Sequence, residues 1–97
     1  MSLSPRQKKH LRGLTHALQP VVTVADKGLT DNVLAEIDLA LSHHELIKIK
    51  LRSDRETRAG QVAEIAGRFG AEQVHVIGQV ACFFRRNPEK PVIELPK

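Results

Sequence analysis

The stretch "LIKIKLR", from Leu46 to Arg52, decides the fold because apolar and basic residues alternate strictly along it. Successive side chains of a β-strand point to opposite faces of the sheet, whereas a strand buried on both faces is a continuous apolar run. The apolar positions would therefore line a buried face, and Lys48, Lys50 and Arg52 would line the other. The pattern predicts a sheet with helices mainly on one face and an open second face.

Helical and strand-like patterns follow one another on both sides of this stretch. Apolar residues at helical spacing alternate with short β-branched runs. The expected elements are a helix over 5–19, a strand over 21–24, a helix over 30–42, the strand over 46–52, a helix over 54–69 and a hairpin over 74–84. The predicted fold class is therefore α/β, in the order α-β-α-β-α-β-β, with a mixed four-stranded sheet.

The hairpin has a recognisable turn at Gly78-Gln79, with glycine at the first central position. In that register His75 lies opposite Cys82, and Val74 lies opposite Phe83. Val74 then shares a face with Phe83. The side chains expected on the open face of the sheet are those of Thr23, Lys48, Lys50, Arg52, His75 and Phe84.

The two ends of the chain carry weaker signals. Leu11, Leu14 and Leu18 follow at helical spacing, so they would face the core. The tail over 86–97 is interrupted by proline and is expected to be extended, with a short edge strand at Val92–Leu95. The third helix would begin at a capping box made by Ser53 and Glu56.

Length and composition are those of one domain over residues 1–97, with 41% hydrophobic residues. The sequence has no apolar run of about 18 residues and no apolar signal-peptide region near its start, so no membrane association is expected. Cys82 is the one cysteine, which excludes an internal disulfide and fits a cytoplasmic protein.

Basic residues are concentrated near the start of the chain. The formal net charge is +4, and the first 25 residues hold Arg6, Lys8, Lys9 and Arg12 but no Asp or Glu. A basic surface of this kind most often contacts nucleic acid or an acidic membrane. The alternative is a soluble basic protein without such a partner.

Catalytic and metal-binding patterns are weak. Local spacing suggests no Ser–His–acid or Cys–His pairing and no carboxylate pair. The adjacent His43 and His44 lie at a helix end, where they suit the helix dipole better than a metal. Cys82 is expected to be a packing residue and His75 an exposed strand histidine. We therefore expect no enzymatic activity, no metal, no cofactor and no small-molecule substrate.

Nucleic-acid contacts are better supported. Lys48, Lys50 and Arg52 of the strand over 46–52 would stand about 7 Å apart, close to the spacing of successive phosphates. The alternative is that they form only a solvated face of the sheet. Phe84 could stack on a base from the same face. In the loop that follows Val24, Lys27 offers a cation and Gly28 permits a positive φ, although a plain turn is the alternative there too.

Taken in order, several blocks of the sequence resemble the YhbY family, the single-domain bacterial form of the CRM domain (chloroplast RNA splicing and ribosome maturation). The resemblance covers essentially the whole chain. It rests on "LSPRQKKHLRGLTHALQPVV", "GLTDNVLAEIDLAL", "HHELIKIKL", "DRET" and "VIGQ".

The resemblance implies an RNA-binding fold similar to the C-terminal domain of the third bacterial translation initiation factor. It also implies association with precursors of the large ribosomal subunit. CRM domains resemble KH modules in carrying a GxxG loop near the RNA backbone. That loop falls on Ala25–Gly28 here, with alanine in place of the first glycine.

We therefore expect an RNA-binding protein that acts in ribosome assembly on ribosomal RNA, as a monomer. The residues expected to contact phosphates are Lys8, Lys9, Arg12, Lys27, Gly28, Lys48, Lys50 and Arg52. Two alternatives remain open. One is a general module for DNA or other structured RNA, and the other is an adaptor that binds ribosomal proteins and uses its charge for steering.

Overall fold

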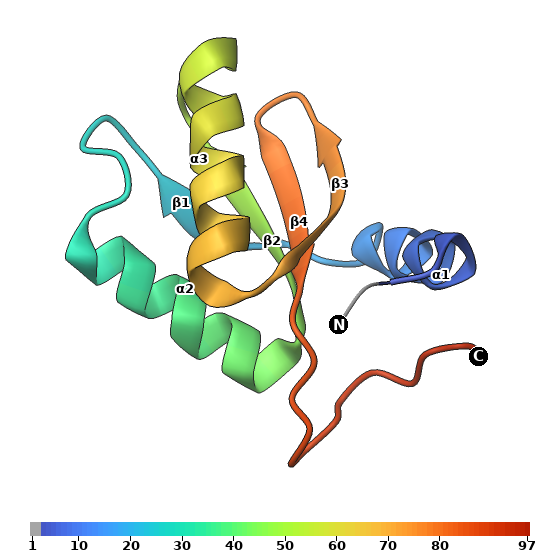
Figure 1. The fold of residues 1–97 in the computed structure, drawn as a ribbon. Helices are drawn as coiled ribbons and strands as arrows, with labels where there is room; N and C mark the ends of the chain where they lie inside the picture. The colour runs from blue at the N-terminus through green and yellow to red at the C-terminus, as the bar shows by residue number, and fades with distance from the viewer. Residues whose placement is uncertain (1–2) are drawn as a thin grey trace.

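The computed structural model describes residues 3–97 and confirms the predicted order of helices and strands (Figure 1). Local patterns place most elements within a few residues of the observed bounds. The elements are α1 (Pro5–Thr15), β1 (Pro20–Val24), α2 (Asp31–His44), β2 (Leu46–Leu51), α3 (Arg55–Phe69), β3 (Glu72–Ile77) and β4 (Val80–Phe84).

The strands form a four-stranded mixed sheet in the order β1-β2-β4-β3. β1 runs parallel to β2, while β4 runs antiparallel to both β2 and β3. The two central strands are therefore β2 and β4, and β1 and β3 form the edges. Figure 1 shows α2 and α3 on one face of this sheet.

The main core lies between the sheet and these two helices. Along β2 the buried residues alternate with half-buried ones from Ile47 to Leu51, as the sequence predicts. Ile47, Ile49 and Leu51 pack with Phe83 of β4 and with Ile37 of α2, all of them at most 1% exposed. Burying large aliphatic and aromatic side chains in this way supplies most of the stability of such a domain.

The second face of the sheet is half covered, which corrects the expectation of an open face. α1 and the C-terminal tail pack over a second cluster that includes Leu11, Leu46, Cys82 and Phe84. The reason is that the second face also carries apolar residues, and packing of α1 and the tail removes them from water. Two of the three helices still lie on one face, and the second face stays open towards the other end of β2.

The hairpin turn and most of its register are as predicted, since Ile77 lies opposite Val80 and His75 opposite Cys82. The prediction for Val74 is wrong. The register shifts between Gln73 and His75, so Val74 moves to the second cluster instead of sharing a face with Phe83. A bulge adds one residue on one strand, and one residue is enough to reverse the face of a side chain.

The helix ends show why α1 and α3 differ from expectation. α1 begins with a capping box between Ser4 and Gln7. It ends at Thr15, before the predicted bound. Thr15 lies four residues after the buried Leu11 and is buried with it, whereas Leu14 is 39% exposed, which corrects the expectation that Leu14 faces the core. α3 is capped by Asp54, whose carboxylate accepts a hydrogen bond from the Thr57 N–H at 2.8 Å, not by Ser53.

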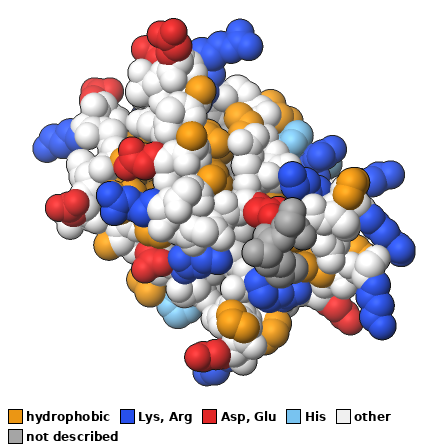
Figure 2. Space-filling model, viewed as in Figure 1, with side chains coloured by type: hydrophobic (Ala, Val, Ile, Leu, Met, Phe, Trp, Pro, Cys, Tyr) orange, Lys and Arg blue, Asp and Glu red, His pale blue; other side chains and the backbone are white. Residues whose placement is uncertain are grey.

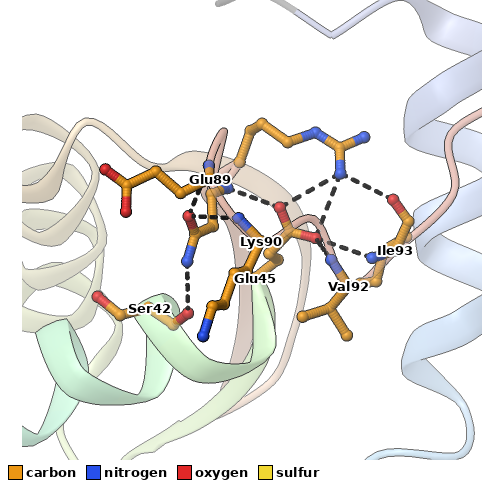
Figure 3. Close-up of polar contacts among 8 residues, drawn as sticks. Ser42, Glu45, Glu89, Lys90, Val92 and Ile93 are labelled. Atoms are coloured by element: carbon orange, nitrogen blue, oxygen red, sulfur yellow. Dashed lines mark hydrogen bonds and ion pairs between the residues drawn. The ribbon is translucent and has the colours of Figure 1, made fainter.

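The tail forms no edge strand at Val92–Leu95, which corrects that prediction. It is held instead by the buried carboxylate of Glu45, which is 0% exposed (Figure 3). The carboxylate accepts hydrogen bonds from the backbone N–H groups of Asn87 (2.6 Å), Val92 (2.6 Å) and Ile93 (2.8 Å). The guanidinium of Arg86 donates to both carboxylate oxygens at 3.2–3.3 Å.

The geometry around Glu45 also governs its charge. Burial raises the pKa of the Glu45 carboxyl, but the three backbone N–H groups and the guanidinium outweigh burial and hold the pKa below its ordinary value of 4.5. Its backbone has a φ of 63°, unusual for a residue other than glycine. Glu45 is the C-cap of α2, and its contacts with the tail hold it in this strained conformation.

Candidate nucleic-acid interface

The basic side chains of β2 lie in one row on the second face of the sheet. Lys48 pairs across the strands with Cys82, and Lys50 pairs with Val80 and Thr23. Both lysines are half-buried, so they are less free than the sequence pattern alone suggested. Arg52 follows the strand and is exposed. With about 3.3 Å per residue, the row from Lys48 to Arg52 is about 13 Å long.

The loop after β1 lies beside the carboxyl end of this row. The backbone N–H of Arg52 donates to the Val24 carbonyl at 2.8 Å, which joins the two segments. Within the loop, the Gly28 N–H donates to the Ala25 carbonyl at 2.9 Å and closes a turn. Lys27 is exposed at this turn, so its ammonium lies at the same end of the sheet as Arg52.

Gly28 is required by conformation more than by space. Its φ is +73°, which side-chain-bearing residues rarely adopt. A Cβ there would meet the amide nitrogen of Gln61 at 3.9 Å, an ordinary contact. After the loop, Thr30 caps α2 by accepting a hydrogen bond from the Val33 N–H at 3.2 Å. A shallow groove of about 400 Å³ runs along the loop.

The basic residues of α1 lie on the helix that covers the other end of the same face. Leu11 and Thr15 are buried against the sheet, Lys8 is half-buried, and Lys9 and Arg12 are exposed. Lys8 and Lys9 are four and three residues before Arg12, so the three side chains share one side of the helix. Figure 2 shows Lys and Arg side chains gathered over α1.

These cations differ from other arginines of the chain in what they contact. Arg85 is held by Asp38 at 2.8 Å and by Ser42, and Arg86 is held by Glu45. Within residues 3–97, no hydrogen bond or ion pair engages the side chains of the predicted phosphate contacts, namely Lys8, Lys9, Arg12, Lys27, Lys48, Lys50 and Arg52. Their charge is therefore available to an external anion.

Phe84 does not lie on an open face, and the prediction that it stacks on a base is wrong. It is 3% exposed in the second cluster. The guanidinium carbon of Arg86 lies 5.6 Å from the centre of its ring, within the range of a cation–π contact. Phe83 is fully buried and Phe69 is half-buried. A base therefore cannot stack on a phenylalanine ring of this surface.

Two further arginines lie in the first part of α3 and were missed in the sequence. Arg55 is exposed in the first turn of α3, and Arg58 donates to the Ser53 carbonyl at 2.7 Å. Gln61 on the same helix lies beside Gly28, which brings the start of α3 to the loop. The sequence contained a signal for them, because basic residues at a helix N-terminus oppose the helix dipole. Their presence there therefore indicates a role other than stabilising the helix.

Cys82 packs in the second cluster, as expected for a packing residue. Cys82 is buried, and burial raises the pKa of its thiol despite the nearby Lys48 and Thr15. Among residues 3–97, no cluster of three or more His, Cys, Asp or Glu could hold a metal ion. Over the same residues, no helix is long and apolar enough to cross a bilayer.

Comparison with known proteins places this geometry in a family. The sequence model of the CRS1 / YhbY (CRM) domain matches residues 3–85. The chain belongs to the CRM domain family. This confirms the resemblance noted in the sequence.

Relatives of this CRM domain carry descriptions as RNA-binding proteins. It is 45% identical to an RNA-binding protein of Haemophilus influenzae, over 99% of this chain and 97% of the relative. It is 41% identical to a probable RNA-binding protein of Pseudomonas aeruginosa, over 92% of this chain and 86% of the relative. A probable RNA-binding protein of Bacillus subtilis is 34% identical, over 97% of this chain and 99% of the relative.

A solved structure shares the fold of this CRM domain. The solution structure of a hypothetical protein of Staphylococcus aureus, proposed to bind RNA, superimposes with a TM-score of 0.83. The two sequences are 29% identical, and the match covers 98% of this chain and 100% of the other.

Proposed function

We propose that this CRM domain is an RNA-binding protein that holds the RNA backbone through its unpaired cations. The observation that carries the proposal is that the lysines and arginines of α1, the Gly28 loop and β2 have no partner within residues 3–97. Unpaired cations on one surface favour phosphate groups, because each contact releases condensed counterions.

Each part of the surface has a distinct role in this proposal. The row of Lys48, Lys50 and Arg52 neutralises successive phosphates along β2. Lys27 extends the row at the turn, where the backbone of Gly28 lets the RNA approach. The basic side of α1 adds contacts at the other end of the face. These contacts position the RNA and carry little sequence information.

The RNA proposed here is ribosomal RNA in precursors of the large subunit, bound by a monomer in the cytoplasm. The support is the resemblance to the single-domain bacterial form of the CRM domain, which implies association with such precursors. The proposed role requires neither a cofactor nor a catalytic group, because the protein acts by binding.

The test compares affinities at one matched salt concentration for fragments of large-subunit ribosomal RNA and for duplex DNA. We expect tighter binding to the ribosomal fragments and weaker binding after Lys48→Gln with Lys50→Gln. Lys90→Gln is the control, because it removes an exposed lysine charge of the tail that does not belong to the row on β2. Equal affinity for DNA would favour a general nucleic-acid module. No binding to protein-free RNA would favour an adaptor on ribosomal proteins.

Crosslinking in cells tests the ribosomal assignment. The protein is crosslinked to RNA, and the recovered positions are mapped. We expect them to fall in precursors of the large-subunit RNA. Recovery of unrelated RNAs at similar levels would contradict the assignment and leave RNA binding itself in place.

A further inference from the structure

An apolar groove of about 540 Å³ lies at the amino-terminal ends of β1 and β2, next to the basic row. Its walls come from separate segments of the chain. They are the end of α1 with Leu14, the segment after α1 with Leu18, the edge strand β1 with Val21, β2 with Leu46, and the tail with Val92 and Ile93. Sites for small organic groups are typically concave, mostly apolar and in this size range.

Exposed apolar side chains are concentrated around the groove. Leu14 is 39% exposed, Val21 is 48% exposed and Val92 is 61% exposed. The tail wall is fixed in place, because the N–H groups of Val92 and Ile93 donate to the Glu45 carboxylate. The groove is therefore a formed feature of the surface.

The polar groups of the groove suit an anionic ligand. Among its lining residues in the described chain, none has a carboxylate, and the polar side chains are those of Gln19, His44 and Lys48. Lys48 is also the first residue of the basic row on β2. The groove and the row are thus continuous through one side chain.

We propose that this groove receives an unstacked base of a single RNA strand whose phosphates lie along the β2 row. The inference rests on the proposed function. Proteins hold bases that have left the stack between apolar or aromatic side chains, with a few polar groups at the base edge. Here Leu14, Val21 and Val92 supply the apolar contact, and Gln19 supplies hydrogen bonds to the base edge.

The two phenylalanines of β4 do not reach this surface. Phe83 and Phe84 are buried, so contact with the base faces would come from the aliphatic lining and from the imidazole of His44. A protein segment is the other class of occupant for an apolar groove. The shared lysine and the lack of carboxylates in the lining favour the nucleic acid.

The experiment uses short single-stranded homopolymers of adenosine or uridine, and a matched oligomer with abasic sugars. The variant Leu14→Gln replaces the apolar side chain with a polar one of similar size. The control is Leu39→Gln on α2, because Leu39 is 61% exposed and lies outside the groove. Affinities are measured by fluorescence anisotropy, and circular dichroism checks that both variants fold.

We expect Leu14→Gln to weaken binding of the base-bearing oligomers about five- to tenfold and to leave the abasic oligomer unchanged. Leu39→Gln should change neither. The inference is overturned if Leu14→Gln binds all oligomers like the parent, or if it loses affinity equally for the abasic one. In those cases RNA binding that still depends on Lys48 keeps the proposed function intact. A parent protein that binds no oligomer overturns this inference, whereas the proposed function is decided by binding of the ribosomal RNA fragments.

Discussion

Replacing Glu45 by glutamine is expected to destabilise the fold by about 2–4 kcal/mol at neutral pH. The carboxylate of Glu45 is fully buried and accepts hydrogen bonds from three backbone N–H groups and from Arg86. A glutamine can offer only one oxygen. Its amide nitrogen would face a backbone donor whichever way the group turns, so at least one buried N–H loses its partner.

The magnitude follows from these contacts. A buried donor without a partner costs about 1–3 kcal/mol, and loss of the charge weakens the bond from the guanidinium. Arg86 keeps 24% of its side-chain surface exposed, so solvent reduces the cost of its unpaired charge. For a chain of this length the change corresponds to a loss of about 10–25 °C in melting temperature.

The pH dependence gives a second readout for Glu45. Because the folded pKa is held below 4.5, the ionised carboxyl adds stability above that value. That contribution is lost as the pH falls through the folded pKa. The stability difference between parent and Glu45→Gln should therefore shrink in acid, and it should be constant between pH 6 and 8 within about 0.5 kcal/mol.

Urea and thermal unfolding, followed by circular dichroism, measure both effects. Glu89→Gln is the matched control, because it removes an exposed carboxyl from the same tail. The reasoning is refuted if Glu45→Gln unfolds within about 0.5 kcal/mol of the parent at neutral pH. It is also refuted if Glu89→Gln costs as much as Glu45→Gln.

Four further predictions concern single features of the fold and the interface. Lys48→Gln with Lys50→Gln should leave the melting temperature nearly unchanged and reduce the slope of log affinity against log salt by roughly one to two units in a salt titration. Lys27→Asp should weaken RNA binding at fixed salt while melting normally; unchanged affinity would make the loop a plain turn. Gly28→Ala should cost about 1–2 kcal/mol in urea unfolding because of its positive φ. Phe84→Ala should cost about 3–5 kcal/mol of stability, and Phe84→Leu, if folded, should bind RNA like the parent.

The alternating pattern of β2 was sufficient to predict the face of the sheet that α2 and α3 cover, and local turn residues placed the neighbouring elements. It did not predict the second cluster under α1 and the tail. Local sequence patterns gave wrong predictions where contacts between distant segments determine the orientation or burial of a side chain. The bulge at Val74 reversed one side chain, and no residue type marks such a shift in a single strand.

The errors at the interface have the same origin. Phe84 is expected on an outward face by strand periodicity, but α1 and the tail cover that part of the face. The role of Glu45 depends on backbone groups more than 40 residues further along the chain, such as that of Val92. The basic residues of β2 and α1 could be identified because charge is a property of the residue itself. That these residues have no partner within residues 3–97 could be seen only in the structure.

The attachment of the tail to Glu45 has a consequence for how the domain can be delimited. The match to the family model ends at residue 85, yet residues 87–93 supply the donors that neutralise a buried carboxylate. A protein truncated at the family boundary would leave that carboxylate with no backbone donors and would uncover Phe84. The folding unit therefore extends beyond the residues that the family model matches. Affinity tags and fusion partners should leave residues 86–97 in place.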